Sequence, residues 1–143
     1  MKNASIPEYV TRVRESFNKQ TIMATIGAQL TEVTAGTVTI ELPYNRDLCQ
    51  QHGFLHAGIV TTIVDSACGY AAYTLMPAEA EVLTVEFKVN FMVPAKGERF
   101  MAQGRVIRAG RTLTITQGDV WAILEGEQKH VAMMQATVMA VRP

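Results

Sequence analysis

The chain has 143 residues, 48% of them hydrophobic, and its 13 basic side chains balance 13 acidic ones, so the net charge at pH 7 is zero. This length and composition are typical of one globular domain over residues 1–143 and exclude an intrinsically disordered chain. Because most non-specific affinity for nucleic acid comes from a surplus of lysine and arginine, the balanced charge also argues against a nucleic-acid partner.

The opening residues, MKNASIPEYVTRVRES, lack the apolar segment of a signal peptide. No stretch reaches the roughly 18 uninterrupted apolar residues that a membrane span requires. We therefore expect a cytoplasmic protein with no membrane partner. Cys49 and Cys68 show no metal-ligand spacing, and Cys68 falls in an apolar helical pattern, where a thiol packs as a small hydrophobe. A disulfide between them is the less favoured alternative, since such pairs are typical of secreted scaffolds.

The first predicted element is a short amphipathic helix over about 7–19. Ser5-Ile-Pro-Glu8 has the pattern of a capping box, and Val10, Val13 and Phe17 recur at helical spacing. From Ile26 to Leu42, β-branched residues alternate with polar ones on both sides of Ala35-Gly36. This alternation predicts a hairpin of two strands that ends at Pro43.

The next predicted element is one long helix from Ala57 to about Leu75, which ends at Met76-Pro77. Its apolar positions follow a 3.6-residue repeat: Ile59, Val60, Ile63, Val64, Ala67, Tyr70 and Ala71. Since the helix is apolar over most of its circumference, it must be largely buried, in a bundle or against a sheet.

Four strand patterns follow and favour the sheet. Leu83, Val85, Phe87, Val89 and Phe91 alternate with polar residues, and three more strand-like runs cover 99–108, 112–124 and 129–141. Turn signals at 94–97, 109–110 and 125–126 separate them, and such short connections join antiparallel neighbours. The sequence thus predicts an α+β fold in which about six antiparallel strands cover one long helix.

Asp65 interrupts the apolar pattern of that helix and is its only acidic residue. A carboxylate among apolar side chains needs a compensating interaction or function. From the helix pattern alone, a catalytic role, a solvent-facing position and a structural hydrogen bond all stay open. The start of the same helix, His56-Ala57-Gly58, must present unpaired backbone N–H groups at the positive end of the helix dipole, which suits an oxyanion.

The order of two strands, a long helix and four strands resembles the hotdog fold, in which the sheet curls around the helix. His56-Ala57-Gly58 at the helix start, with Asp65 within the helix, resembles the H-G-G…D signature of PaaI-like (phenylacetate-pathway) acyl-CoA thioesterases. Thr84 and the Arg-Ala-Gly-Arg-Thr turn at 108–112 also match that family's layout. The resemblance implies acyl-CoA hydrolysis with Asp65 as general base or nucleophile and the N–H groups of Ala57 and Gly58 as the oxyanion hole.

The resemblance implies further site residues. Thr84, on the polar side of its strand, matches a Ser or Thr that holds the water beside the carboxylate, and Gln50 stands where several relatives have an Asn that contacts the thioester or water. Ala57 replaces the more common Gly and keeps its N–H. We expect His56 to shape the loop and helix cap. CoA belongs to the substrate, so no separate cofactor is implied.

Residues around this motif are predicted to bind the substrate. We expect His52 near the pocket and the acyl group to contact Phe54 and Leu55, together with Tyr70 and Tyr73 of the helix. Arginine side chains near the 109–110 turn suit the CoA phosphates, and these are Arg105, Arg108 and Arg111. A metal site at His52 and His56 is disfavoured because Gly53 breaks any helix there and no third ligand is evident.

Helix geometry predicts that two subunits share the site. Ala57 and Asp65 are eight residues apart, which corresponds to about 12 Å along a helix axis at 1.5 Å per residue. An oxyanion donor and a base must each lie about 3 Å from the reacting group. One helix therefore cannot supply both, and a homodimer with Ala57 of one subunit opposite Asp65 of the other can. The resemblance implies the same, and we expect a dimer of dimers, a homotetramer.

Two other functions stay open at this point. A hotdog hydratase or dehydratase would carry a D-x-N-P-[IV]-H motif, which this chain lacks. A non-catalytic acyl-CoA-binding or regulatory module is possible on the same scaffold, because a fold does not determine function. Asp65 argues against it, since a binder gains nothing from a carboxylate beside the thioester.

Overall fold

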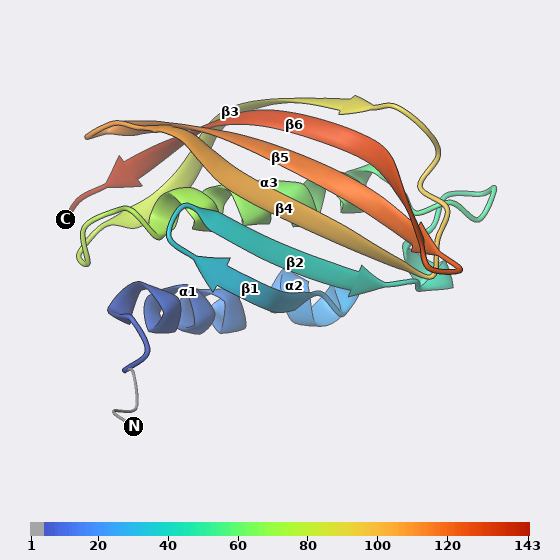
Figure 1. The fold of residues 1–143 in the computed structure, drawn as a ribbon, viewed down its shortest axis with the longest axis horizontal. Helices are drawn as coiled ribbons and strands as arrows, with labels where there is room; N and C mark the ends of the chain where they lie inside the picture. The colour runs from blue at the N-terminus through green and yellow to red at the C-terminus, as the bar shows by residue number, and fades with distance from the viewer. Residues whose placement is uncertain (1–4) are drawn as a thin grey trace.

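The computed structural model describes residues 5–143 and contains a six-stranded sheet with helices on its inner side (Figure 1). The α-helices are α1 (Glu8–Lys19), α2 (Thr21–Ile26) and α3 (Ala57–Tyr73), and a 3-10 turn, η1, covers Arg46–Leu48. The strands are β1 (Gln29–Thr34), β2 (Thr37–Pro43), β3 (Glu81–Phe91), β4 (Arg99–Ala109), β5 (Leu113–Leu124) and β6 (Glu127–Val141).

All neighbouring strands are antiparallel, in the order β1-β2-β4-β5-β6-β3. The sheet curls around α3, which contacts β2, β3, β4, β5 and β6. The core lies between α3 and the inner face of the sheet, where Ile63, Val64, Ile40, Phe100 and Val120 are fully buried. The predicted hotdog fold is confirmed. No helix among residues 5–143 is both long and apolar enough to cross a membrane.

A pair of glycines lets α3 lie very close to the middle of the sheet. Gly104 of β4 and Gly118 of β5 pair directly across the sheet. A Cβ on Gly104 would lie 2.4 Å from the carbonyl carbon and oxygen of Ala67, and one on Gly118 would lie 2.7 Å from the Sγ of Cys68. Because carbon atoms normally approach to about 3.5 Å, only glycine fits beneath the helix at this point.

The predicted alternation along β3 is wrong at its start, because a bulge changes the face to which its side chains point. The pairing with β6 shifts between Thr84 and Glu86. Leu83 and Val85, the first two apolar residues of the predicted alternation, are 59% and 57% exposed. Thr84, predicted on the polar side, instead turns towards α3 and hydrogen-bonds Asp65. A bulge inserts one residue into a strand and so breaks the two-residue repeat.

The N-terminal region differs from the prediction in two respects. The helix starts at Glu8 with Pro7 as N-cap and no side-chain cap, so the expected capping box does not form. Ile26 belongs to α2, a helix that the sequence pattern missed, and β1 starts only at Gln29. Six residues with several β-branched side chains have little helix preference of their own, and burial of Met23 and Ile26 in the core supplies the stabilisation.

Candidate active site

The backbone at the start of α3 provides one free hydrogen-bond donor. His56 is the N-cap, and its Nδ1 accepts the N–H of Gly58 at 2.8 Å. The N–H groups of Ile59 and Val60 donate to the His56 carbonyl. Ala57 N–H alone among these lacks an acceptor within residues 5–143. His56 thus caps the helix, and Gly58 N–H, predicted as a second oxyanion donor, is already engaged.

The side chain of Gln50 supplies a second donor beside Ala57. Its Oε1 accepts the backbone N–H groups of His52 and Phe54, which closes the loop before α3. Since the amide oxygen is occupied by two donors, the Nε2 hydrogens are the free part of this side chain. Gln50 and Ala57 line the same cavity of about 300 Å³, whose other walls are apolar and include Phe54, Leu55, Val60 and Phe91.

Asp65 lies two turns further along α3 and is half-buried. Thr84 Oγ1 donates to its Oδ1 at 2.8 Å. Burial raises the pKa of the Asp65 carboxyl above its ordinary value, and the Thr84 hydrogen bond opposes this by stabilising the charged form. A carboxylate with a raised pKa is a stronger base than one in water, which suits the activation of a nucleophile.

Asp65 and Thr84 line a second cavity, of about 310 Å³. α1, α3 and the start of β3 form its walls, and its other lining residues include Ser16, Gln20, Ser66, Gly69 and Tyr70. No residue lines both this cavity and the one at Ala57. Within one chain Ala57 and Gln50 therefore line one cavity and the Asp65 carboxylate lines another, as the spacing along α3 requires.

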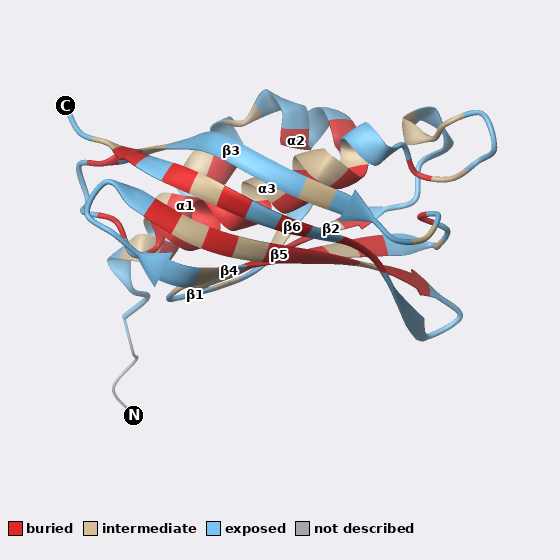
Figure 2. Ribbon diagram, turned by 90° about the horizontal axis from the view of Figure 1, so that it is seen from above, coloured by how far each residue is buried: buried red, intermediate tan, exposed pale blue. Residues whose placement is uncertain are grey.

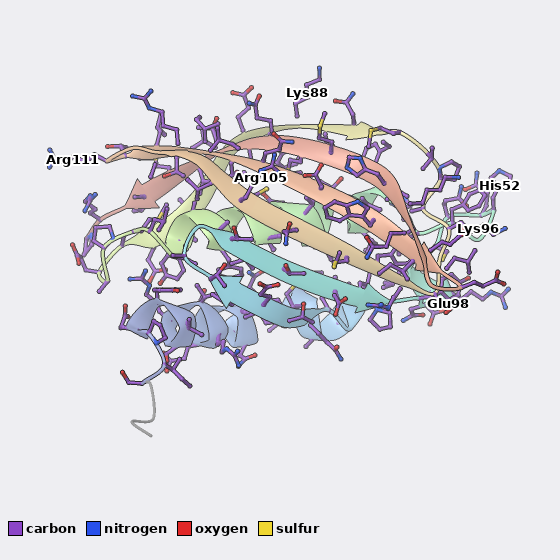
Figure 3. All side chains as sticks on the ribbon, viewed as in Figure 1. His52, Lys88, Lys96, Glu98, Arg105 and Arg111 are labelled. Carbon is purple, nitrogen blue, oxygen red and sulfur yellow. The ribbon has the colours of Figure 1, made fainter. Side chains whose placement is uncertain are left out.

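The other predicted substrate-binding residues do not gather around one pocket. His52 lies at the exposed tip of the loop before α3 and lines neither cavity, while Arg111 lies at the opposite end of the molecule (Figure 3). Arg108 and Arg111 are exposed on the β4–β5 hairpin, but Arg105 donates to Asp119 at 3.1 Å. The three arginines therefore do not converge as predicted.

The residues predicted to line one acyl pocket lie at two different cavities. Phe54 and Leu55 line the cavity at Ala57, Tyr70 lines the cavity at Asp65, and Tyr73 lines neither.

Within residues 5–143, no three His, Cys, Asp or Glu side chains are close enough to hold a metal ion. Both cysteines are free thiols.

Sequence reasoning missed Ser16, Gln20 and Gly69 in the cavity at Asp65. Ser16 and Gln20 come from the N-terminal helix and the turn after it, far from the motif in the sequence. Gly69 could have been identified from the sequence. A glycine inside a helix lowers the stability of the helix, so its presence there indicates a packing or functional reason. It lies four residues after Asp65 and so on the same helix face.

Comparisons with known proteins show the family and support the fold. Residues 52–127 match the family model described as the thioesterase superfamily. A crystal structure of a thioesterase family protein from Silicibacter pomeroyi is 53% identical, with a TM-score of 0.93 over 94% of this chain and 99% of that one. Acyl-coenzyme A thioesterase 13 of Homo sapiens is 27% identical over 119 residues, 81% of each chain. The E. coli PaaI protein from the phenylacetic acid degradation operon has a TM-score of 0.83 at 13% identity, over 93% of both chains.

Proposed function

The chain belongs to the thioesterase superfamily and is a thioester hydrolase, and we propose that it cleaves acyl-CoA at a site built from two subunits. The observation that carries this proposal is the placement of Ala57 and Asp65 in separate half-sites of one chain. Two copies of α3 lying antiparallel across a two-fold axis bring Ala57 and Gln50 of one subunit opposite Asp65 and Thr84 of the other. Two equivalent sites result.

In the proposed reaction, Ala57 N–H and Gln50 Nε2 donate to the thioester oxygen as negative charge develops on it. The Asp65 carboxylate removes the proton from an attacking water held beside Thr84, or attacks the carbonyl carbon itself. The C–S bond then breaks and CoA leaves as a thiolate. When water attacks, the acid is released directly, and when Asp65 attacks, a water then hydrolyses the acyl–Asp65 anhydride to release the acid and restore the carboxylate. Because a thiol has a pKa of roughly 8.5, its departure needs no strong general acid.

β3 provides the proposed contact between the two subunits. It is an edge strand, paired with β6 on one side only, so its other side presents unpaired backbone groups. Figure 2 shows β3 exposed along most of its length, and Val85 and Phe87 are 57% and 42% exposed. An antiparallel β3–β3 contact would pair these groups, bury the apolar side chains and set the two α3 helices side by side.

Other parts of the sequence prediction stay proposals. For the dimer of dimers, we propose the outer face of the sheet as the second contact, where Leu83, Met139 and Leu113 lie in register and are 37–59% exposed. Arg108 and Arg111 remain our proposed contacts for the CoA phosphates. A cytoplasmic location, the lack of a nucleic-acid partner and the relation to PaaI in substrate also remain predictions.

A complementation experiment tests the shared site. Asp65→Asn removes the base and keeps the side-chain shape. Ala57→Pro removes the oxyanion donor, and proline is favoured at the first helical position. The preceding His56 has ψ 137°, which a following proline accepts. Thiol release from a panel of acyl-CoAs should fall at least about 10²-fold in each variant, whereas Asp47→Asn, at an exposed carboxylate, should retain activity.

Co-expression of Asp65→Asn with Ala57→Pro separates a shared site from a site within one chain. Half of the dimers that form at random are mixed, and each mixed dimer has one site with both native groups, so activity should return to about a quarter of wild type. Mixed dimers, verified by two affinity tags, that stay inactive would contradict the shared site. A wild type that binds acyl-CoA without releasing thiol would contradict the proposed activity and favour a binding module.

A further inference from the structure

We infer that a hollow on the outer face of the sheet is a nucleotide-binding site, separate from the two cavities beside α3. This outer hollow has a volume of about 270 Å³. The residues that line it come from β3, β5 and β6 and are Lys88, Asn90, Gln117, Met133, Met134 and Gln135. None of them lines the cavities at Ala57 and Asp65. The inference concerns a further ligand and does not depend on the proposed hydrolysis.

The strand register places the polar side chains of the outer hollow on the face away from α3. Gly118 of β5 faces α3, because a Cβ on it would lie 2.7 Å from the Sγ of Cys68. Since side chains alternate along a strand, Gln117 points to the opposite face. Gln117 pairs with Gln135 of β6, and Gln135 pairs with Lys88 of β3. Directly paired residues share a face of the sheet, so these side chains form a row across three strands.

The cations at the two ends of this row suit the phosphates of a nucleotide. Lys88 is exposed, and its ammonium group forms no ion pair within residues 5–143. At the other end, Arg105 of β4 pairs with Gln117 and so extends the row by one strand. Neighbouring strands lie about 4.8 Å apart, which puts the Cα atoms of Arg105 and Lys88 about 14 Å apart. Both side chains are long and flexible, so they can reach a phosphate chain held between them.

No aspartate or glutamate lines the outer hollow. Asp119 of β5 lies near it, but both oxygens of its carboxylate have partners. Arg105 Nη1 donates to Asp119 Oδ2 at 3.1 Å, and His130 Nε2 lies 2.8 Å from Asp119 Oδ1. A guanidinium has five N–H donors and this bond uses one, so Arg105 can still donate to an anion. Glu86, two residues before Lys88, lies outside the lining. A phosphate in the outer hollow therefore meets cations without a lining carboxylate to repel it.

The remaining lining groups suit a nucleobase. The side-chain amides of Asn90, Gln117 and Gln135 make no hydrogen bond within residues 5–143. Each offers both donors and an acceptor, and the edges of nucleobases carry the complementary groups. Met133, which is 39% exposed, presents a thioether, and thioethers contact aromatic rings favourably. The volume of about 270 Å³ exceeds the ~150 Å³ that holds benzene in an engineered cavity, so a purine ring fits.

Titration calorimetry with ADP tests the site. Wild type should bind ADP at the outer hollow of each chain, and should bind adenosine or pyrophosphate, which each lack one half of the ligand, at least about 10-fold more weakly. Lys88→Gln removes the unpaired cation and should raise the Kd for ADP at least about 10-fold. Gln135→Leu should weaken the binding of ADP but not of pyrophosphate. Lys129→Gln makes the same charge change at an exposed lysine outside the outer hollow and should keep the wild-type Kd.

CoA also carries an adenosine phosphate, so competition separates two sources of this ligand. If CoA displaces a fluorescent ADP analogue from wild type but Lys88→Gln binds neither at this site, the outer hollow takes the nucleotide of CoA as well as free nucleotide. If the analogue stays bound in excess CoA, the outer hollow is a site for free nucleotide.

Three results would overturn the inference. ADP binding that is lost in Arg111→Gln and kept in Lys88→Gln would place the nucleotide at the proposed CoA contact. Equal Kd values for ADP and pyrophosphate would show a simple anion site without base recognition. Absence of ADP binding to folded wild type would leave the outer hollow without this ligand, and light scattering on wild type and Lys88→Gln would then show whether a second copy of the chain covers it.

Discussion

Replacement of Gly104 by alanine should weaken both the fold and catalysis, because this glycine determines how closely α3 approaches the sheet. The added Cβ would lie 2.4 Å from the Ala67 carbonyl carbon and oxygen and 2.5 Å from Cys68 N. These are backbone atoms, which cannot turn away as a flexible side chain does. Restoring a carbon contact of about 3.5 Å requires the helix to move by about 1 Å.

This displacement predicts two magnitudes. Overpacking of a core commonly lowers the free energy of unfolding by about 1–3 kcal/mol. For a domain near this size each kcal/mol corresponds to about 2–4 °C, so the Tm should fall by about 2–12 °C. α3 carries Ala57 and Asp65, and a misplacement of about 1 Å can lower the rate about 10²-fold. We therefore expect kcat to fall by more than the loss of folded protein explains.

Thermal unfolding followed by circular dichroism, with kcat measured well below the Tm, tests this prediction. The matched control is Gly69→Ala on α3 itself, where the new methyl group meets nothing within 4 Å. It should raise the free energy of unfolding by about 0.5–1 kcal/mol, since alanine favours a helix over glycine. A Gly104→Ala protein with wild-type Tm and kcat would refute the close contact between α3 and the sheet.

Two further predictions concern the carboxylate and the end of α3. Thr84→Val removes the hydrogen bond that lowers the pKa of Asp65, so that pKa should rise and the acid limb of the pH profile of kcat/KM should move to higher pH. Thr84→Ser keeps the donor and should restore the wild-type limb, and a limb that stays in place in Thr84→Val would contradict the role of this bond. Arg12 of α1 donates from Nη2 to the carbonyls of Tyr73 (2.7 Å) and Met76 (3.0 Å). Because Arg12→Met removes these charged hydrogen bonds, it should lower the free energy of unfolding by about 1.5–3 kcal/mol, measured by urea unfolding. An unchanged urea midpoint would contradict a stabilising role for the contacts of Arg12 with the carbonyls at the end of α3.

Local repeats along the chain predicted most of the elements. The 3.6-residue repeat after Ala57 predicted α3, and alternation between turn signals predicted the last four strands, because a buried face imposes its own period on the sequence. The same reasoning missed α2, whose short run of residues is helical only through burial in the core. It also missed the β3 bulge at Thr84 and Glu86, since one extra residue in a strand leaves no clear mark in composition.

The site shows the same division. Helix geometry and the single acidic residue of α3 placed Ala57 and Asp65 about 12 Å apart, and the structure puts them in separate cavities. The occupied N–H of Gly58, the engagement of Arg105 by Asp119 and the separation of Phe54 from Tyr70 could not be read from spacing. Each depends on which side chain comes within hydrogen-bonding or contact distance once the chain is folded.

By itself, the sequence determined the class of fold, the long buried helix and the carboxylate within it. These features follow from the spacing of apolar and polar side chains, which can be recognised over a few neighbouring residues. Only the tertiary structure decided which donors stay free, how Thr84 turns towards Asp65, and that Ser16, Gln20 and Gly69 border the same cavity. The residues that border this cavity lie up to 68 positions apart in the sequence. Their geometry follows from the packing of α1, α3 and β3 against one another, which no local pattern encodes.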